Sequence, residues 1–195
     1  MQVIFHRLAE AIYFSTAARD DGVTVMVPGY DRTSPVPHDL AHFVAEHEFG
    51  LDRGFWGSVA AGAMFTNMKV VEGRRRPHAD ERSKRILKAN GMWVGASEAL
   101  AGAVHDAVEE GHTPEHALAA LRRMHGVVST EPLPIKVADV ERAIGALRAA
   151  AARWAEVPVG EGMALQWRLP VHDPGAGRRR SKARKSGRRL PRGAR

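Results

Sequence analysis

The chain has 195 residues, 44% of them hydrophobic, which is enough for one domain with a buried core. It contains no cysteine, which excludes disulfides and thiolate metal sites, so any metal ligand must be His, Asp or Glu. The formal net charge is +7, but residues 173–195 carry ten Lys or Arg and one acid, which leaves 19 basic and 21 acidic residues before them. The positive charge therefore belongs to the C-terminal segment and does not indicate a nucleic-acid-binding body.

Other broad classes find no support in the sequence. Residues 1–8 do not resemble a secretory signal, and no uncharged apolar run reaches about 18 residues, so we expect a cytoplasmic protein without a transmembrane helix. No Gly-rich phosphate loop of the GxGxxG or GxxxxGK[ST] type is present, so no nucleotide cofactor is indicated.

The first predicted elements in chain order are strands. Short β-prone runs occupy residues 3–5, 12–16 and 23–27, and Asp-Asp-Gly at residues 20–22 predicts a β-hairpin. Pro37 suits the first turn of a helix that ends near Phe49. A second helix is predicted over residues 55–69.

Helical patterns dominate the rest of the chain. We predict helices over residues 80–88 and 93–109, separated at Asn90-Gly91, then one from Thr113 to Gly126, and an Ala-rich helix around residues 140–154. Residues 163–169 alternate like a final strand that would pair with the N-terminal hairpin. The sequence thus predicts one mostly helical α+β domain over residues 1–172. A disordered Arg/Lys-rich tail is predicted over residues 173–195.

One segment carries a chemical signal, the predicted helix that begins at Pro37. His38 and His42 are four residues apart, which on a helix puts them on one face about 6 Å apart, the spacing that gives two imidazoles to one metal. Glu46 continues this row and is a further candidate ligand. Because Glu46 and His38 are two turns apart, about 11–12 Å, a straight helix cannot place all three around one ion.

Another ligand would then come from elsewhere in the chain. The candidates are His78, His105, Asp106, Glu109, His112 and His116. Asp39 has two interpretations: a group that hydrogen-bonds a metal ligand or acts as a general base, or an acid favoured by the helix N-terminal dipole.

The sequence Pro-His-Asp-Leu-Ala-His at residues 37–42 resembles the His-Asp-x-x-His motif of the coenzyme Q biosynthesis protein family. This resemblance implies zinc, quinone precursors and a membrane surface. The family's motif has a Glu twelve residues after the second His, where this chain has Gly54, so Glu46 or Glu48 would have to replace it. The zinc-protease signature His-Glu-x-x-His is also similar, with Asp39 in place of the base. Residues 37–62 further resemble a block found in an uncharacterised bacterial protein family.

These observations lead to three hypotheses. The first is a protein that binds zinc or another divalent metal through His38, His42 and Glu46, with catalysis left open. The second is a non-enzymatic adaptor whose tail binds nucleic acid or another polyanion without sequence preference. The third is a structural or interaction protein without chemistry. The polyanion-binding residues of the second hypothesis are Arg178, Arg179, Arg180, Lys182, Arg184, Lys185, Arg188 and Arg189.

Overall fold

The computed structural model describes residues 1–9, 12–29, 34–128, 134–172 and 174. Its elements in chain order are β1 Gln2–Ala9, β2 Ile12–Ala18, β3 Thr24–Pro28, α1 His38–Glu48, α2 Phe55–Ala61, β4 Lys69–Glu72, α3 Ala79–Glu109, α4 Pro114–Val128, α5 Val137–Ala155 and β5 Gly162–Gln166. This arrangement confirms an α+β fold that is mostly helical.

The five strands form one antiparallel sheet in the order β4-β3-β2-β1-β5. The turn between β2 and β3 contains Gly22, whose φ of 81° lies in the left-handed region that glycine tolerates best. This turn confirms the hairpin that residues 20–22 predict. The C-terminal strand β5 pairs with β1, with Phe5 opposite Met163, which confirms the predicted final strand.

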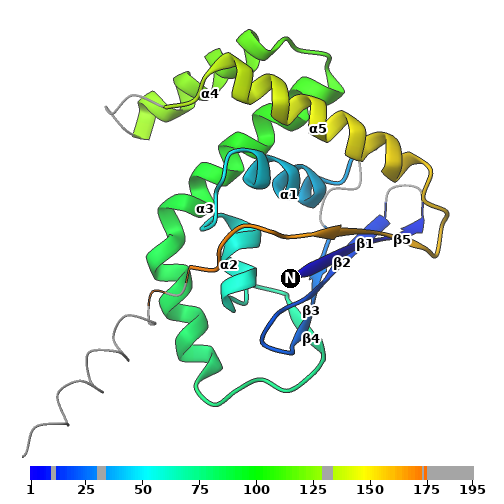
Figure 1. Cartoon of the computed structure of the whole chain (residues 1–195), viewed down its shortest axis with the longest axis vertical. Coiled ribbons are helices and arrows are strands. Elements are labelled where there is room, and N and C mark those ends of the chain that lie inside the picture. Colours follow the sequence, from blue (N-terminus) through cyan, green and yellow to red (C-terminus); the bar gives the residue numbers. More distant parts are fainter. Residues whose placement is uncertain (10–11, 30–33, 129–133, 173, 175–195) are drawn as a thin grey trace, which may run out of the picture.

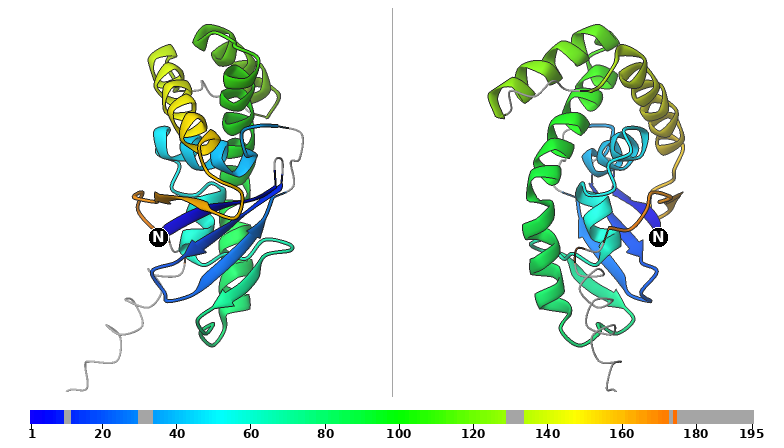
Figure 2. Two further views of the ribbon diagram at one scale, coloured as in Figure 1. Left: turned by 90° about the vertical axis from the view of Figure 1, so that its right-hand side faces the viewer. Right: turned by 60° about the vertical axis from the view of Figure 1, so that its left-hand side comes forward.

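One face of the sheet is covered by α1 and α2, and α3 lies beyond these helices (Figures 1 and 2). The ring of Phe5 on β1 meets Phe43 of α1 and Trp56 of α2 edge to face, with ring centroids 6.0 and 5.9 Å apart. On its other sides α1 packs against α3 and α5. The helix that begins at Pro37 is therefore an internal element, covered by the sheet and by two further helices.

The second helix is shorter than predicted. It ends at Ala61 and not near Lys69, because Gly62 adopts a φ of 108° and terminates it in the left-handed conformation. The residues that follow the turn form strand β4, which pairs with β3 at the edge of the sheet and which the sequence analysis did not predict.

The predicted interruption at Asn90-Gly91 is absent, and α3 is one helix of 31 residues. Asn90 is buried, and its side-chain amide donates a hydrogen bond to Ser58 Oγ of α2 over 3.0 Å. This tertiary contact favours helix at a position where local propensity favours a turn. Gly91 is exposed and costs the helix only its intrinsic penalty.

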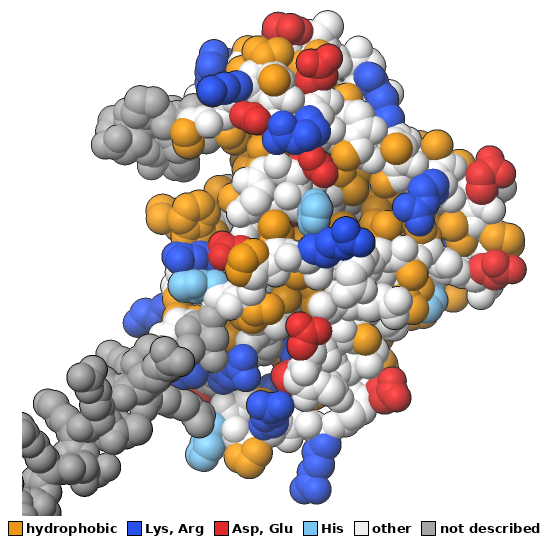
Figure 3. Space-filling model, in the orientation of Figure 1, with side chains coloured by type: hydrophobic (Ala, Val, Ile, Leu, Met, Phe, Trp, Pro, Cys, Tyr) orange, Lys and Arg blue, Asp and Glu red, His pale blue; other side chains and the backbone are white. Residues whose placement is uncertain are grey.

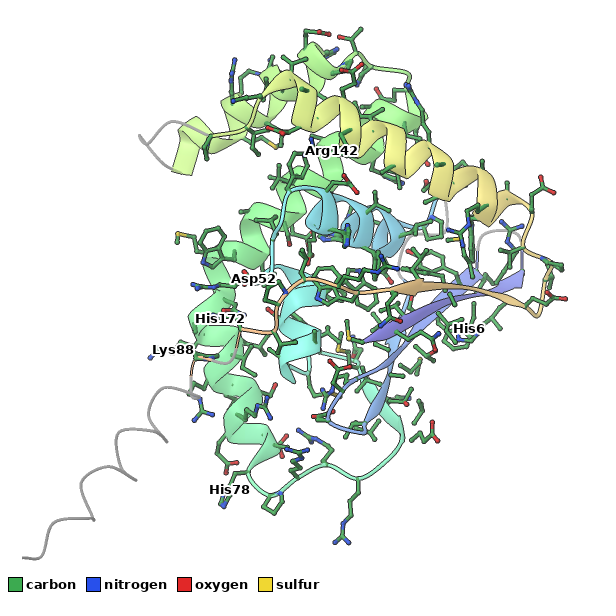
Figure 4. All side chains as sticks on the ribbon, in the orientation of Figure 1. His6, Asp52, His78, Lys88, Arg142 and His172 are labelled. Carbon is green, nitrogen blue, oxygen red and sulfur yellow. The ribbon has the colours of Figure 1, made fainter. Side chains whose placement is uncertain are left out.

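The last two helices lie where the sequence places them. Helix α4 begins at Pro114, and α5 buries Val140, Ile144, Leu147 and Trp154 along one face. Arg142 of α5 reaches α1, where its Nε lies 3.1 Å from Glu48 Oε2 (Figure 4). This exposed ion pair joins α5 to the C-terminal end of α1.

The remaining predictions concern the charged segments and the membrane. Lys and Arg side chains are spread over the whole face in Figure 3, with Asp and Glu side chains between them. The predicted disordered tail, with its eight polyanion-binding Arg and Lys residues, lies outside the described residues apart from Pro174. Over the residues that the structure describes, no helix has the length and apolar character needed to cross a membrane.

Replacement of Gly91 by Ala tests the continuity of α3. A Cβ at this position would meet no atom within 4 Å, so Gly91→Ala should raise the free energy of unfolding by about 0.5–1 kcal/mol through helix propensity alone. Urea unfolding of the purified protein measures this. As a contrast, Gly62→Ala places a side chain at a φ of 108° and should destabilise the fold. A loss of stability in Gly91→Ala would contradict a continuous helix.

Candidate metal centre

The site is built on α1, which is buried on nearly every side. Apolar residues of this helix face the sheet and α5, and the polar residues His42 and Glu46 are also buried, with only 3% and 0% of their surface exposed. A polar side chain at such a depth is costly unless it is hydrogen-bonded. The hydrogen-bond partners of His42 and Glu46 therefore decide the charge and orientation of the site's side chains.

Three side chains converge at the N-terminal half of α1: His38, His42 and Glu98. Each offers one ligand atom, and the three atoms lie within 4.8 Å of one another. Oε2 of Glu98 is 3.1 Å from Nε2 of His42 and 3.6 Å from Nε2 of His38. The structure thus brings together the two histidines that the sequence singles out and adds a carboxylate, and this group could hold a metal ion.

Glu98 is not among the residues considered from the sequence. It is contributed by α3, 56 residues after His42, and its side chain is 58% exposed. Only its position three residues before Ala101 and seven before His105, which are both buried, could have indicated that it faces α1. Without the packing of α3 against α1, no pattern connects it to the histidines.

Glu46 is in contact with His42 but is not part of this group. Its carboxylate accepts hydrogen bonds from the backbone N–H groups of Phe55, Trp56 and Gly57, over 2.7, 3.0 and 3.3 Å. Its Oε1 also lies 3.4 Å from Nδ1 of His42, the ring nitrogen that faces away from Glu98. In this arrangement Glu46 orients the imidazole of His42 and caps the N-terminus of α2 through these three backbone N–H groups.

Gly54 lies directly against this carboxylate. A Cβ built at position 54 would come within 2.6 Å of Oε2 and 2.8 Å of Oε1 of Glu46. Position 54 therefore has no room for a side chain, because the carboxylate of Glu46 occupies that space. Glu48, the other substitute considered from the sequence, pairs with Arg142.

The six other candidate ligands lie outside the group. His105 is the nearest, with its ring centroid 5.5 Å from that of His38, but its Nε2 is 2.9 Å from the carbonyl oxygen of Val36. Glu109 contacts the hydroxyl of Ser34. The remaining residues lie at the surface or pair locally: His78, Asp106, His112 and His116.

The charges of the site are strongly coupled. Burial lowers the pKa of His42, but hydrogen bonds with Glu46 and Glu98 outweigh burial and raise this pKa to about 9. Hydrogen bonds with His38 and His42 hold the pKa of Glu98 well below its usual range. Burial raises the pKa of Glu46, against the effect of His42 and of the backbone N–H groups. At neutral pH His42 is therefore an imidazolium held between two carboxyl groups.

Asp39 lies in the first turn of α1 and borders the same space. Its Oδ2 is buried and has no hydrogen-bond partner among the described residues. Burial raises the pKa of Asp39 to about 6, and the nearby histidines limit this rise. Its place in the first turn of α1 fits the helix-dipole interpretation, and its role toward the histidines stays a prediction.

A cleft of about 270 Å³ opens beside the group, and His38, Asp39, His42 and Glu98 form its polar side. Its other walls come from β2, β3, the start of α2 and the turn before β4. The ligand atoms thus lie beside a space that a small molecule can enter.

No protein-family model matches the chain, and comparison with curated proteins and with solved structures finds no match.

The interactions of His42 with Glu46 and Glu98 predict that the free energy of unfolding of the metal-free protein depends on pH. Because the folded protein holds the His42 proton more tightly than the unfolded chain does, this proton contributes its full stabilisation below pH 6.5. The contribution is lost as the pH rises through about 9. The free energy of unfolding in the presence of a chelator should therefore fall between these values. The same fall in His42→Gln would show that other groups cause it.

Proposed function

We propose that the protein binds a divalent metal ion of the zinc type through His38, His42 and Glu98. The observation that carries this proposal is the convergence of two imidazole nitrogens and one carboxylate oxygen at the wall of a cleft. Two His and one Glu are a donor set of catalytic zinc sites, which use three protein ligands and leave a position open. Glu98 here takes the place that the sequence analysis assigns to Glu46.

The distances support this set. Ligand atoms about 2.0–2.1 Å from a tetrahedral zinc ion lie about 3.4 Å from one another. The separations of 3.1 and 3.6 Å between Glu98 and the two histidines bracket this value. The three ligand atoms lie within 4.8 Å of one another, whereas two atoms bound to one zinc ion are at most about 4.2 Å apart. The partly exposed His38 and the exposed Glu98 must therefore turn toward the ion, while His42 is held by its surroundings.

The hydrogen bonds of His42 support its role as a ligand. Nδ1–H of His42 donates a hydrogen bond to Glu46, and Nε2 faces Glu98. Metal-bound histidines commonly use their second nitrogen in this way, which fixes the tautomer and makes the imidazole a better donor. In the metal-free protein a proton on Nε2 holds Glu98, and metal binding would release this proton.

The open side of the site suggests a role beyond structure. A metal ion bound there would act as a Lewis acid toward a molecule in the cleft. Asp39 borders the cleft, and its buried Oδ2 accepts no hydrogen bond in the described part of the chain. The polyanion-binding adaptor remains a prediction about the tail, and no contact described here supports it.

The metal content of the untagged protein tests the proposal. We expect about one Zn²⁺ or Co²⁺ per chain, and at least about 100-fold weaker binding in His38→Ala, His42→Ala and Glu98→Ala, because loss of a ligand should exceed the 10–100-fold cost of losing its hydrogen-bond partner. His47→Ala is the matched control, since His47 lies on the same helix and pairs with Glu48. Sub-stoichiometric metal that is unchanged in the three variants would contradict the site.

A second experiment separates the roles of Glu46 and Glu98. Glu46→Gln keeps an acceptor oxygen for α2 but removes the charge beside His42, so metal affinity should fall about 10–100-fold without a change in stoichiometry. Glu48→Gln on the same helix should leave the affinity unchanged. If Glu46 were itself a ligand, Glu46→Gln would match Glu98→Gln in its loss and would alter the absorption spectrum of bound Co²⁺ as strongly.

A further inference from the structure

The cleft beside the metal-ligand group has an unusual charge pattern for a binding site. None of the described residues that line it is Lys or Arg, whereas Asp39 and Glu98 are both acids. A divalent ion held by Glu98 and faced by Asp39 retains little net positive charge. An anionic molecule that entered the cleft would therefore meet no countercharge other than the ion.

The wall opposite the acids is apolar and partly aromatic. It consists of Tyr13, Val27, Pro28, Phe55, Phe65 and Met68. The rings of Phe55 and Phe65 lie 4.8 Å apart between centroids and are tilted by 31°. The ring of Phe55 is in turn 5.8 Å from that of His42. The apolar surface thus begins directly beside a ligand of the proposed metal.

The size of the space limits what it can hold. A volume of about 270 Å³ is slightly below the range of about 300–1,000 Å³ that is usual for small-molecule sites. Burial of an aromatic or aliphatic body against this wall supplies affinity by the hydrophobic effect, without a charge on the ligand. A compact body with a single donor atom fills such a space and still reaches the ion.

We propose that the cleft selects a small, neutral, mainly apolar molecule that reaches the metal through one lone-pair donor atom. This inference rests on the proposed metal site and adds the class of its ligand. Selection against anions follows from the two acids and the absence of basic lining among the described residues. Selection for an apolar body follows from the wall formed by β2, β3 and the turn before β4.

Probe binding to the Co²⁺-loaded full-length protein tests this. The probes are imidazole, 4-phenylimidazole and benzoate at pH 8, where the two imidazoles are mainly neutral and benzoate is an anion. The change in the visible spectrum of Co²⁺ reports binding. We expect 4-phenylimidazole to bind at least about tenfold more tightly than imidazole, because the added ring is buried on the apolar wall, and benzoate to bind more weakly than 4-phenylimidazole.

Two variants of the wall sharpen the test. Thr66 lines the cleft and is exposed, so Thr66→Lys adds a cation there without disturbing the core. It should raise benzoate affinity about fivefold and leave 4-phenylimidazole nearly unchanged, whereas Val159→Lys, at a surface position that does not line the cleft, should change neither. Met68→Ala should reduce the preference for the phenyl ring, and Met124→Ala, which is also outside the cleft, should not.

The outcomes distinguish this inference from the proposed function. Absence of bound Co²⁺ would overturn the metal site itself. Bound Co²⁺ with equal affinity for both imidazoles, or with tighter binding of benzoate than of 4-phenylimidazole, would overturn the ligand class and leave the metal site standing. A phenyl preference that Met68→Ala leaves intact would show that the ring binds outside the cleft, which also contradicts the inference.

Discussion

The carboxylate of Glu46 is the interaction on which the arrangement of the site depends. A fully buried carboxylate costs several kcal/mol unless it is paired and hydrogen-bonded. Here it accepts hydrogen bonds from three backbone N–H groups at the start of α2. These N–H groups have no partner within their own helix, so the carboxylate satisfies them. Gly54 leaves the space that this contact requires. One side chain therefore fixes α2 against α1 and holds the ring of His42.

The same contact extends to the sheet through Trp56. Its backbone N–H binds Glu46, and its indole Nε1–H donates to the carbonyl oxygen of Asp39 over 2.9 Å. The indole ring also packs edge to face against Phe5 of β1. The first turn of α1, which carries His38, is thus positioned by a residue of α2 that is itself placed by Glu46. The polar site and the hydrophobic core are parts of one packing arrangement.

Local patterns in the sequence predicted the elements that local chemistry determines. The helix at His38 follows from Pro37 and the apolar residues after it, and the hairpin follows from its Asp-Gly turn. Tertiary contacts decided the rest. Asn90 is helical because it binds Ser58, and β4 exists because it pairs with β3, although its residues are mostly exposed. The partners of Glu46 are backbone groups, which carry no sequence signal.

Glu98 is the part of the site that most needed the fold, and the reason lies in α3. Its N-terminal half is tied to α2 through Asn90, and its C-terminal half packs Leu100 and Val104 into the core. Glu98 lies between these anchors, so its backbone is fixed while its carboxylate remains exposed. Because only its backbone is fixed, the Glu98 side chain can break its hydrogen bond with His42 and turn toward an ion that arrives from solvent. A helix broken at Gly91 would loosen the anchor at Asn90 and with it the approach of this carboxylate to the two histidines.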